Sequence, residues 1–254
     1  MDVIIMYAVW NISKSFNELK VLDDMTIEFE EFKTTAILGP SGCGKTTLLN
    51  IISGLDQPDS GEVEGFLYEK ISFVFQEDRL IPWRTVGDNI RFVLKGKMDR
   101  EKIDRTVNRY LEQVGLKEYI NYYPKKLSGG MKQRIGMLRA FVYPSAILLM
   151  DEPFRSLDIA NKKASMDFLK ELIACEMRTC VLVTHDLDEA VELGDRIVIL
   201  SDKPTTVKKV ITNMYRVDGT EESRVKARKL LENEILSVRC EVKDSKFVCD
   251  IFSE

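Results

Sequence analysis

Residues 39–46 read Gly39-Pro40-Ser41-Gly42-Cys43-Gly44-Lys45-Thr46, which is the pattern G-x-x-x-x-G-K-[ST] of a phosphate-binding loop. Residues 34–38 before it predict a short buried strand, and residues 46–52 after it predict a helix. In that context the glycines let backbone N–H groups turn toward phosphate oxygens, and the helix N-terminus adds partial positive charge. We therefore predict a nucleotide site that comprises Gly39, Pro40, Ser41, Gly42, Cys43, Gly44, Lys45, Thr46 and Thr47.

Two side chains of this loop have roles that follow from their chemistry. The ammonium of Lys45 is expected to reach the β- and γ-phosphates, and the hydroxyl of Thr46 is expected to bind Mg²⁺. The predicted ligand is therefore a nucleoside triphosphate with Mg²⁺.

The composition is that of an ordinary globular chain. Its 254 residues are 44% hydrophobic and 31% charged, enough for one large domain or two small ones with a sizeable core. The net charge of −4 argues against nucleic acid as the main partner. Five scattered cysteines suggest a reducing cytosol, and the first residues give no sign of a signal peptide.

Hydrophobic patterning predicts an α/β fold. Residues 3–12 and 21–29 alternate apolar and polar side chains, as half-buried antiparallel strands do. Continuous apolar runs, typical of parallel strands buried on both faces, alternate with helical segments further along the chain. The strands are predicted at residues 71–75, 146–150, 179–184 and 196–200, and the helices between the later ones at 159–175 and 186–193. We predict a phosphate-loop NTPase core: a mixed, mainly parallel sheet with helices on both faces, plus N-terminal antiparallel strands.

A helical block interrupts this pattern. From residue 85 to about 140, apolar residues recur at helical spacing, so we expect a helical subdomain inserted at about 80–143. The ATPase domain is predicted over residues 1–215. Residues 216–254 are predicted to form a C-terminal tail with a helix over 221–235 and a short hairpin over 238–252. Cys240 and Cys249 either face each other across that hairpin or are two unpaired core thiols, and a reducing cytosol favours the unpaired thiols.

Polar residues follow three of the predicted strands. They are Gln76, the pair Asp151 and Glu152, and His185. Ligands of open parallel sheets bind beyond the carboxyl ends of the strands, so we expect these groups at the nucleotide. Asp151 suits Mg²⁺, and Glu152 suits the attacking water as general base. His185 is the only histidine in the sequence, which excludes a histidine-cluster metal site. When each of these strand-end residues is considered by itself, the alternative is a purely structural role at the end of its strand.

Two further features have both a structural and a functional interpretation. Ser128, Gly129 and Gly130 open a predicted helix, and its N-terminus is either an ordinary capped end or a second anion site. Phe16 is either a packing residue or a platform on which an adenine ring stacks.

The ordered set of motifs resembles the ATP-binding cassette (ABC) ATPases. The separations are 31 positions from Lys45 to Gln76, 23 from Ser128 to Asp151, and 33 from Glu152 to His185, as in that family. The resemblance, over residues 3–212, implies a head-to-tail homodimer in which each ATP lies between one chain's phosphate loop and the other's Ser128, Gly129 and Gly130. It also implies adenine stacking on Phe16, a place for Asp158 at the dimer seam, and roles for Gln76 in catalysis and Mg²⁺ binding.

Within that family, residues 74–86 resemble the nitrate, sulfonate and taurine importer group. This implies a cytoplasmic motor, peripheral on the inner face of the cell membrane, that acts on integral membrane permease subunits and is served indirectly by a substrate-binding protein. Residues 76–83 would contact the permease, unless Trp83 is a buried packing residue. The alternatives are a soluble ABC ATPase of DNA repair or translation, and an exporter motor.

One residue near the predicted seam departs from the family pattern. Arg155 stands where a small residue is usual, between the carboxylates and Asp158. The departure removes no catalytic group.

Overall fold

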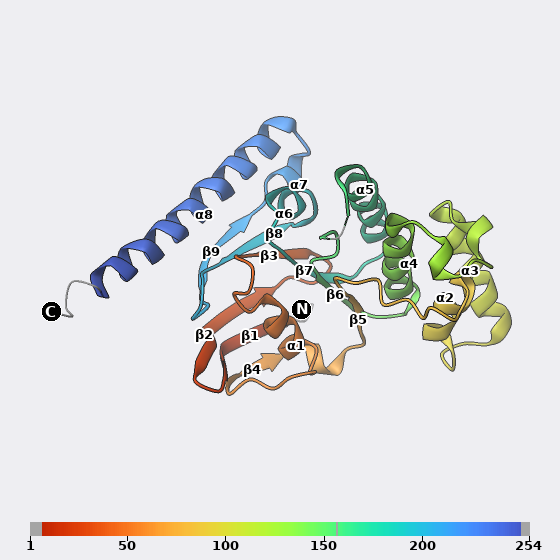
Figure 1. Ribbon diagram of the computed structural model, residues 1–254, viewed down its shortest axis with the longest axis horizontal. Helices are drawn as coiled ribbons and strands as arrows, with labels where there is room; N and C mark the ends of the chain where they lie inside the picture. Colours follow the sequence, from red (N-terminus) through yellow and green to blue (C-terminus); the bar gives the residue numbers. More distant parts are fainter. Residues whose placement is uncertain (1–6, 156, 250–254) are drawn as a thin grey trace, which may run out of the picture. The chain divides into compact units, whose positions relative to one another are not determined.

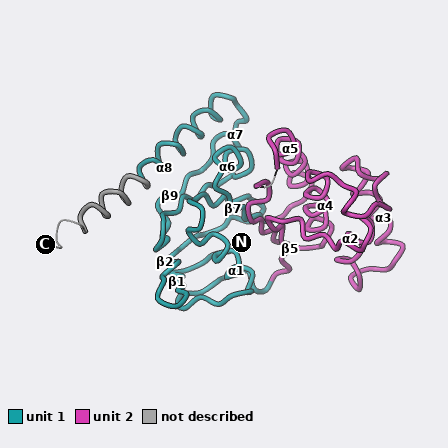
Figure 2. Tube along the Cα trace, in the orientation of Figure 1, with its two compact units in different colours: residues 1–68, 179–254 teal, residues 69–178 magenta. Residues whose placement is uncertain are grey.

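The computed structural model describes residues 7–155 and 157–249. Two compact units compose it, residues 1–68 with 179–254, and residues 69–178 (Figure 2). The first unit holds the phosphate loop and His185, and the second holds the other predicted strand-end groups. Residues 216–249, predicted as a C-terminal tail, are part of the first unit.

An antiparallel sheet opens the first unit. Strands β1 (Tyr7–Phe16) and β2 (Leu19–Phe29) form a hairpin, and β4 (Ser60–Glu64) pairs with the other side of β1. The rings of Tyr7 and Phe29 both pack on Phe66 beneath this sheet. The patterning did not predict β4, because its residues are largely exposed and polar and only pairing with β1 defines them as a strand.

The second sheet of this unit positions the phosphate loop. Strand β3 (Thr34–Leu38) lies between β7 (Thr179–Thr184) and β8 (Arg196–Leu200), parallel to both, and β9 (Val207–Thr212) pairs antiparallel with β8. Leu38 is in register with Thr184. The phosphate loop and His185 therefore leave neighbouring strands at the same end of the sheet.

The helices of the first unit are α1 (Lys45–Ile52), α6 (Leu187–Leu193), α7 (Tyr215–Asp218) and α8 (Glu221–Cys249), with a 3₁₀ turn at Phe66–Tyr68 (Figure 1). Helix α8 is anchored in the core by Leu231, which is fully buried in a cluster with residues of β3, α6 and β8. Ion pairs from Arg224 to Glu192 (2.6 Å) and from Arg228 to Asp188 (3.0 Å) attach it to α6.

The structure corrects the expected hairpin at 238–252. Helix α8 continues without a break to Cys249, and residues 250–252 lie outside the described part. No glycine or proline occurs in residues 221–249, so the sequence contains neither of the residues that most strongly end a helix, and the helix continues through Asp244 and Ser245. The side chains of Cys240 and Cys249 are likewise outside the described part.

Among its described residues, the second unit combines two strands and four α-helices. Strands β5 (Ile71–Val74) and β6 (Ile147–Asp151) pair in parallel. The expected helical block is present as α2 (Val86–Leu94), α3 (Arg100–Gln113) and α4 (Gly129–Val142), with 3₁₀ turns at Lys117–Tyr119 and Pro124–Lys126; α5 (Ile159–Cys175) follows β6. The predicted fold class is confirmed: a mixed α/β protein with an antiparallel N-terminal sheet and mainly parallel pairing elsewhere.

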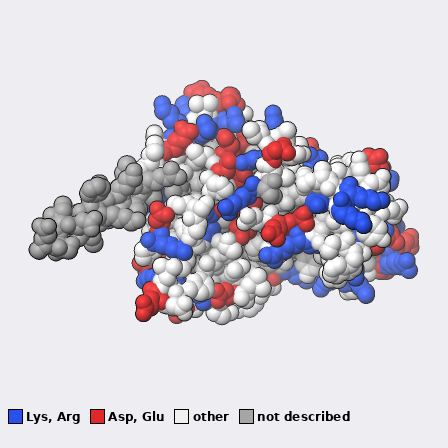
Figure 3. Space-filling view, in the orientation of Figure 1, with Lys and Arg blue, Asp and Glu red and all other residues white. Residues whose placement is uncertain are grey.

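The surface carries charges of both signs. On the face shown in Figure 3, lysine and arginine side chains are interspersed with aspartate and glutamate. Within the described ranges, no helix combines the length and the apolar character that crossing a bilayer requires.

Candidate active site

The phosphate loop has a backbone that its glycines make accessible. Gly42 and Gly44 have φ values of +80° and +110°, a region that side chains rarely adopt. A Cβ on Gly44 would also lie 2.6 Å from Cγ1 of Val21 on β2. The glycine at this position is therefore required both by the turn and by the close approach of β2.

Lys45 curls back over the loop that precedes it. Its ammonium donates hydrogen bonds to the carbonyl oxygens of Gly39 (2.8 Å) and Pro40 (2.7 Å), and the residue is only 4% exposed. A buried cation held on backbone carbonyls at the mouth of this loop is suited to bind an anion placed there.

The N-terminus of α1 fits an anionic ligand. No side chain caps this helix, and its N-cap is Gly44. Helices α2, α3, α4, α5 and α6 of the same chain all carry side-chain caps. Because the first N–H groups of a helix need acceptors, the missing cap is what a phosphate-binding helix start requires.

Cys43 contributes backbone and bulk to the loop. Its side chain is buried, and burial raises the pKa of the thiol, so the neutral form prevails at physiological pH. The hydroxyl of Thr205 donates to the carbonyl oxygen of Cys43. This bond ties the phosphate loop to the segment between β8 and β9. No sequence motif had identified Thr205.

His185 lies at a cavity that the phosphate loop also lines. The cavity, about 120 Å³, is bounded by His185 and by Gly39, Pro40 and Ser41, among others. Ile235 of α8 contributes to the same wall. The structure thus places the predicted histidine beside the predicted phosphate loop, and it adds a residue of the tail that sequence reasoning missed.

Hydrogen bonds on both sides of His185 fix the turn that presents it. The hydroxyl of Thr184 donates to the carboxylate of Glu189 (2.5 Å) and accepts from the N–H of Asp186 (3.0 Å). Asp186 in turn caps α6 by accepting from the N–H groups of Asp188 and Glu189. The exposed imidazole therefore projects from a well-fixed backbone.

Phe16 ends β1 with its ring 47% exposed. The ammonium of Lys14 lies 5.4 Å from the ring centroid and is itself paired with Asp56 (2.9 Å). A half-exposed ring is consistent with either interpretation, so adenine stacking on Phe16 stays a prediction.

In the second unit, the two strand ends bring Gln76 and the carboxylates to one edge. Val74 is in register with Met150, so Gln76 and Glu152 each lie two residues past the same rung. Asp151 is half-buried as the last residue of β6, and Glu152 is 6% exposed with φ at +43°. Gln76 is exposed.

The glycine-rich helix start packs against the helix that Asp158 caps. The hydroxyl of Ser128 accepts from the N–H of Met131 (3.3 Å), and a Cβ on Gly130 would lie 2.7 Å from Oδ1 of Asn161. Both nitrogens of Asn161 donate to the carboxylate of Asp158, at 3.0 and 2.7 Å, and these bonds lower the pKa of that carboxyl. Asn161, which no motif identified, thus joins the two predicted dimer-contact elements.

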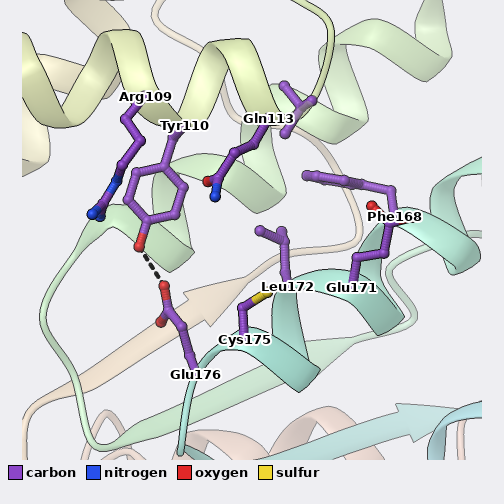
Figure 4. Close-up of a pocket in the computed structure, with 9 residues that line it drawn as sticks. Arg109, Tyr110, Gln113, Phe168, Glu171, Leu172, Cys175 and Glu176 are labelled. Atoms are coloured by element: carbon purple, nitrogen blue, oxygen red, sulfur yellow. Dashed lines mark hydrogen bonds between the residues drawn. The ribbon is translucent and has the colours of Figure 1, made fainter.

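A cavity of about 350 Å³ also lies between α3 and α5, and no predicted site residue lines it (Figure 4). The hydroxyl of Tyr110 donates to the carboxylate of Glu176, which also pairs with Arg178. Burial, together with the bond to Glu176, raises the pKa of Tyr110 to about 12. We assign this cavity to the packing of α3 on α5.

Comparisons with known proteins agree with this geometry. The sequence profile of the ABC transporter family matches residues 22–155. An aliphatic sulfonates import ATP-binding protein of Pseudomonas syringae is 41% identical over 194 residues, covering 76% of this chain and 82% of that protein. Its counterpart in Bacillus cereus is 40% identical over 227 residues, covering 85% of this chain and 89% of that protein.

A solved structure gives the same result. An ATP-binding cassette captured as a dimer in a post-hydrolysis state, bound to ADP and Pi, superposes with a TM-score of 0.69 at 31% identity. The match covers 81% of this chain and 98% of that one. With its phosphate loop, its strand-end carboxylates and these relatives, the chain belongs to the ABC transporter family and is one of its ATP-hydrolysing cassettes.

Proposed function

We propose that this chain is the motor subunit of an importer, which hydrolyses ATP to drive uptake of a small solute of the nitrate, sulfonate or taurine type. The observation that carries the proposal is the 41% identity, over 76% of the chain, to a protein named for aliphatic sulfonate import. The chain works from the cytoplasmic face of the membrane on separate permease subunits, which a substrate-binding protein supplies.

The phosphate loop binds the triphosphate of ATP in this proposal. The uncapped start of α1 offers N–H groups to phosphate oxygens. When ATP binds, the Lys45 ammonium leaves the carbonyl oxygens of Gly39 and Pro40 and binds the β- and γ-phosphates instead. The binding set is Gly39, Pro40, Ser41, Gly42, Cys43, Gly44, Lys45, Thr46 and Thr47, with Phe16 stacked on the adenine.

Hydrolysis needs a group that orients and deprotonates water. Glu152 is buried at the end of β6, where its carboxylate accepts the proton of the attacking water. His185 stands at the loop-lined cavity, where its imidazole hydrogen-bonds the γ-phosphate. Gln76 contributes an amide at the same strand-end edge as Glu152.

Thr46, Gln76 and Asp151 are proposed to hold Mg²⁺. A hydroxyl, an amide carbonyl and a carboxylate are the hard oxygen ligands that Mg²⁺ prefers, and no cluster of three acidic, histidine or cysteine side chains suited to a metal occurs among the described residues. Few protein ligands are typical of a magnesium ion that is also held by substrate phosphates. Bound there, Mg²⁺ supplies positive charge against the phosphate oxygens.

Two copies of the chain are proposed to enclose the nucleotide. The start of α4 at Ser128, Gly129 and Gly130 presents a second helix N-terminus, which meets the γ-phosphate held by the other copy. Asp158 faces the seam between copies. A cassette of known structure, 31% identical to this chain, is likewise a dimer.

Residues 76–83, which we name the docking segment, are proposed to contact the permease. Trp83 within it is 77% exposed, which contradicts the packing interpretation and leaves a large aromatic surface for a partner. An exposed tryptophan of this kind is a common anchor of protein interfaces.

The test is co-purification from gently solubilised membranes of source cells. The Glu152→Gln chain with ATP is expected to bring down a multi-span membrane protein, and Trp83→Ala is expected to weaken that association at least about tenfold, since interface tryptophans often contribute 2 kcal/mol or more. Tyr68→Ala, which removes another exposed aromatic, is the matched control and should have no effect. Recovery of ribosomal or DNA-repair proteins without a membrane protein would favour the alternative class and overturn the importer proposal.

A further inference from the structure

Arg155 contacts the carboxylate that the proposed function makes the general base. Its Nη1 donates to Oε2 of Glu152 at 3.1 Å. The Glu152 side chain is 8% exposed, whereas the Arg155 side chain is 48% exposed. The arginine therefore reaches inward from the surface to a buried carboxylate.

The backbone between these residues is closed by a second bond. The N–H of Arg155 donates to the carbonyl oxygen of Glu152 at 3.2 Å, so one short turn is bridged by both main chain and side chain. Glu152 has φ at +43°, which costs a non-glycine residue free energy and persists only where the surroundings hold it. The side-chain bond from Arg155 is one such restraint.

Other contacts fix the base of the same turn. Phe154 is 1% exposed, and the carbonyl oxygen of Pro153 accepts a hydrogen bond from Gln133. With the turn anchored in the core at 153 and 154, the guanidinium of Arg155 has a fixed origin from which to set the orientation of the Glu152 carboxylate.

We propose that Arg155 is a positioning residue for ATP hydrolysis, which holds the Glu152 carboxylate in the orientation that the attacking water requires. The proposal rests on the proposed function, because it takes Glu152 to be the base. A charge-assisted bond to a buried carboxylate is stronger and more directional than a surface ion pair. By contrast, the pair of Arg105 with Glu101 on α3 is 72% and 81% exposed and is expected to contribute little.

The test is steady-state ATP hydrolysis by Arg155→Ala, Arg155→Lys and the control Arg105→Ala. Arg155→Ala is expected to lower kcat about tenfold with KM for ATP within about twofold, because a displaced base slows the chemical step and leaves ground-state binding intact. Arg155→Lys keeps the charge and should recover part of kcat, and Arg105→Ala should match the wild type. An unchanged or raised kcat in Arg155→Ala, or an effect on KM alone, would overturn the proposal.

A second measurement separates this role from an action at the dimer seam. In the Glu152→Gln background, adding Arg155→Ala should leave the ATP-driven dimer fraction unchanged in sedimentation velocity. A lower dimer fraction would assign Arg155 to the seam and refute its positioning role. If Glu152→Gln alone hydrolyses ATP at the wild-type rate, Glu152 is not the base and the proposed function is refuted. If Glu152→Gln is slow but Arg155→Ala has normal turnover, only the positioning role of Arg155 is refuted.

Discussion

The side-chain amide of Gln133 donates a hydrogen bond of 2.5 Å to the carbonyl oxygen of Pro153. Gln133 is 3% exposed in the second turn of α4, and Pro153 follows Glu152 directly. A single buried bond thus joins the helix that the Ser128 motif opens to the turn that carries the proposed base.

Replacing Gln133 by leucine should therefore affect both stability and catalysis. The Pro153 carbonyl would be left buried without this donor, which costs about 1–3 kcal/mol in the free energy of unfolding. We also expect kcat to fall, because the turn at Glu152 loses an anchor. Urea denaturation and steady-state ATP hydrolysis measure the two effects, and Gln113→Leu on the exposed face of α3 is the control. Equal stability of the two variants would contradict this account of the turn.

His185→Ala should reduce ATP hydrolysis at least tenfold, about 1.4 kcal/mol in the activation barrier. The imidazole is exposed at the cavity that Gly39, Pro40 and Ser41 line, so its removal should leave the fold intact. Thermal unfolding checks the fold, and a phosphate-release assay measures turnover. Full activity would mean that His185 has only a structural role.

The role of His185 could be predicted from the sequence, whereas the role of Gln133 could not. His185 was predicted from its place after a buried strand, and the register of Leu38 with Thr184 puts it where that reasoning expected. The bond from Gln133 to Pro153 could not be predicted, because it joins elements that are distant in sequence and belongs to no motif. The same is true of Asn161 between Gly130 and Asp158, and of Ile235 beside the phosphate loop.

The strands of the fold also fall into those that the sequence pattern predicts and those that it does not. Buried strands such as β3 and β7 are built on consecutive apolar residues, 36–38 and 180–183, and this pattern predicts them directly. Strands β4 and β9 are mostly exposed, so only pairing with a neighbour defines them. In the tail, residues 238–242 alternate apolar and polar side chains like a strand, but no glycine or proline interrupts the chain there and the helix continues.

Leu231→Ala tests whether α8 is an integral part of the first unit. Leu231 is fully buried among residues of β3, α6 and β8, so truncation should cost about 2–5 kcal/mol in the free energy of unfolding. Its neighbour Leu230 is 40% exposed, and Leu230→Ala is the matched control with an expected cost below about 1 kcal/mol. If both variants unfold at the same urea concentration, the helix does not contribute to the core as described.

Tyr110 makes the stability of the folded protein depend on pH above neutrality. Its pKa is raised to about 12 in the folded protein, from an ordinary value of 10.0, by burial and by the bond to Glu176 (Figure 4). A raised pKa means that the stabilisation is fully present below pH 10 and is lost as pH rises toward 12.

The stability difference between the wild type and Tyr110→Phe should therefore be constant up to about pH 10 and shrink above it. Urea unfolding of both proteins between pH 7 and pH 11 measures this difference. A difference that grows with pH over that range would contradict the assignment of the Tyr110 hydroxyl as donor to Glu176.

Sedimentation velocity of the Glu152→Gln chain, with and without Mg²⁺ and ATP, tests the central claim most directly. If one copy's Ser128 helix completes the phosphate loop of the other, and hydrolysis is what separates them, this variant should shift from monomer to dimer when ATP is added. Lys45→Ala in the same background should stay monomeric, because ATP no longer binds. A Glu152→Gln chain that binds ATP and remains a monomer would contradict the account.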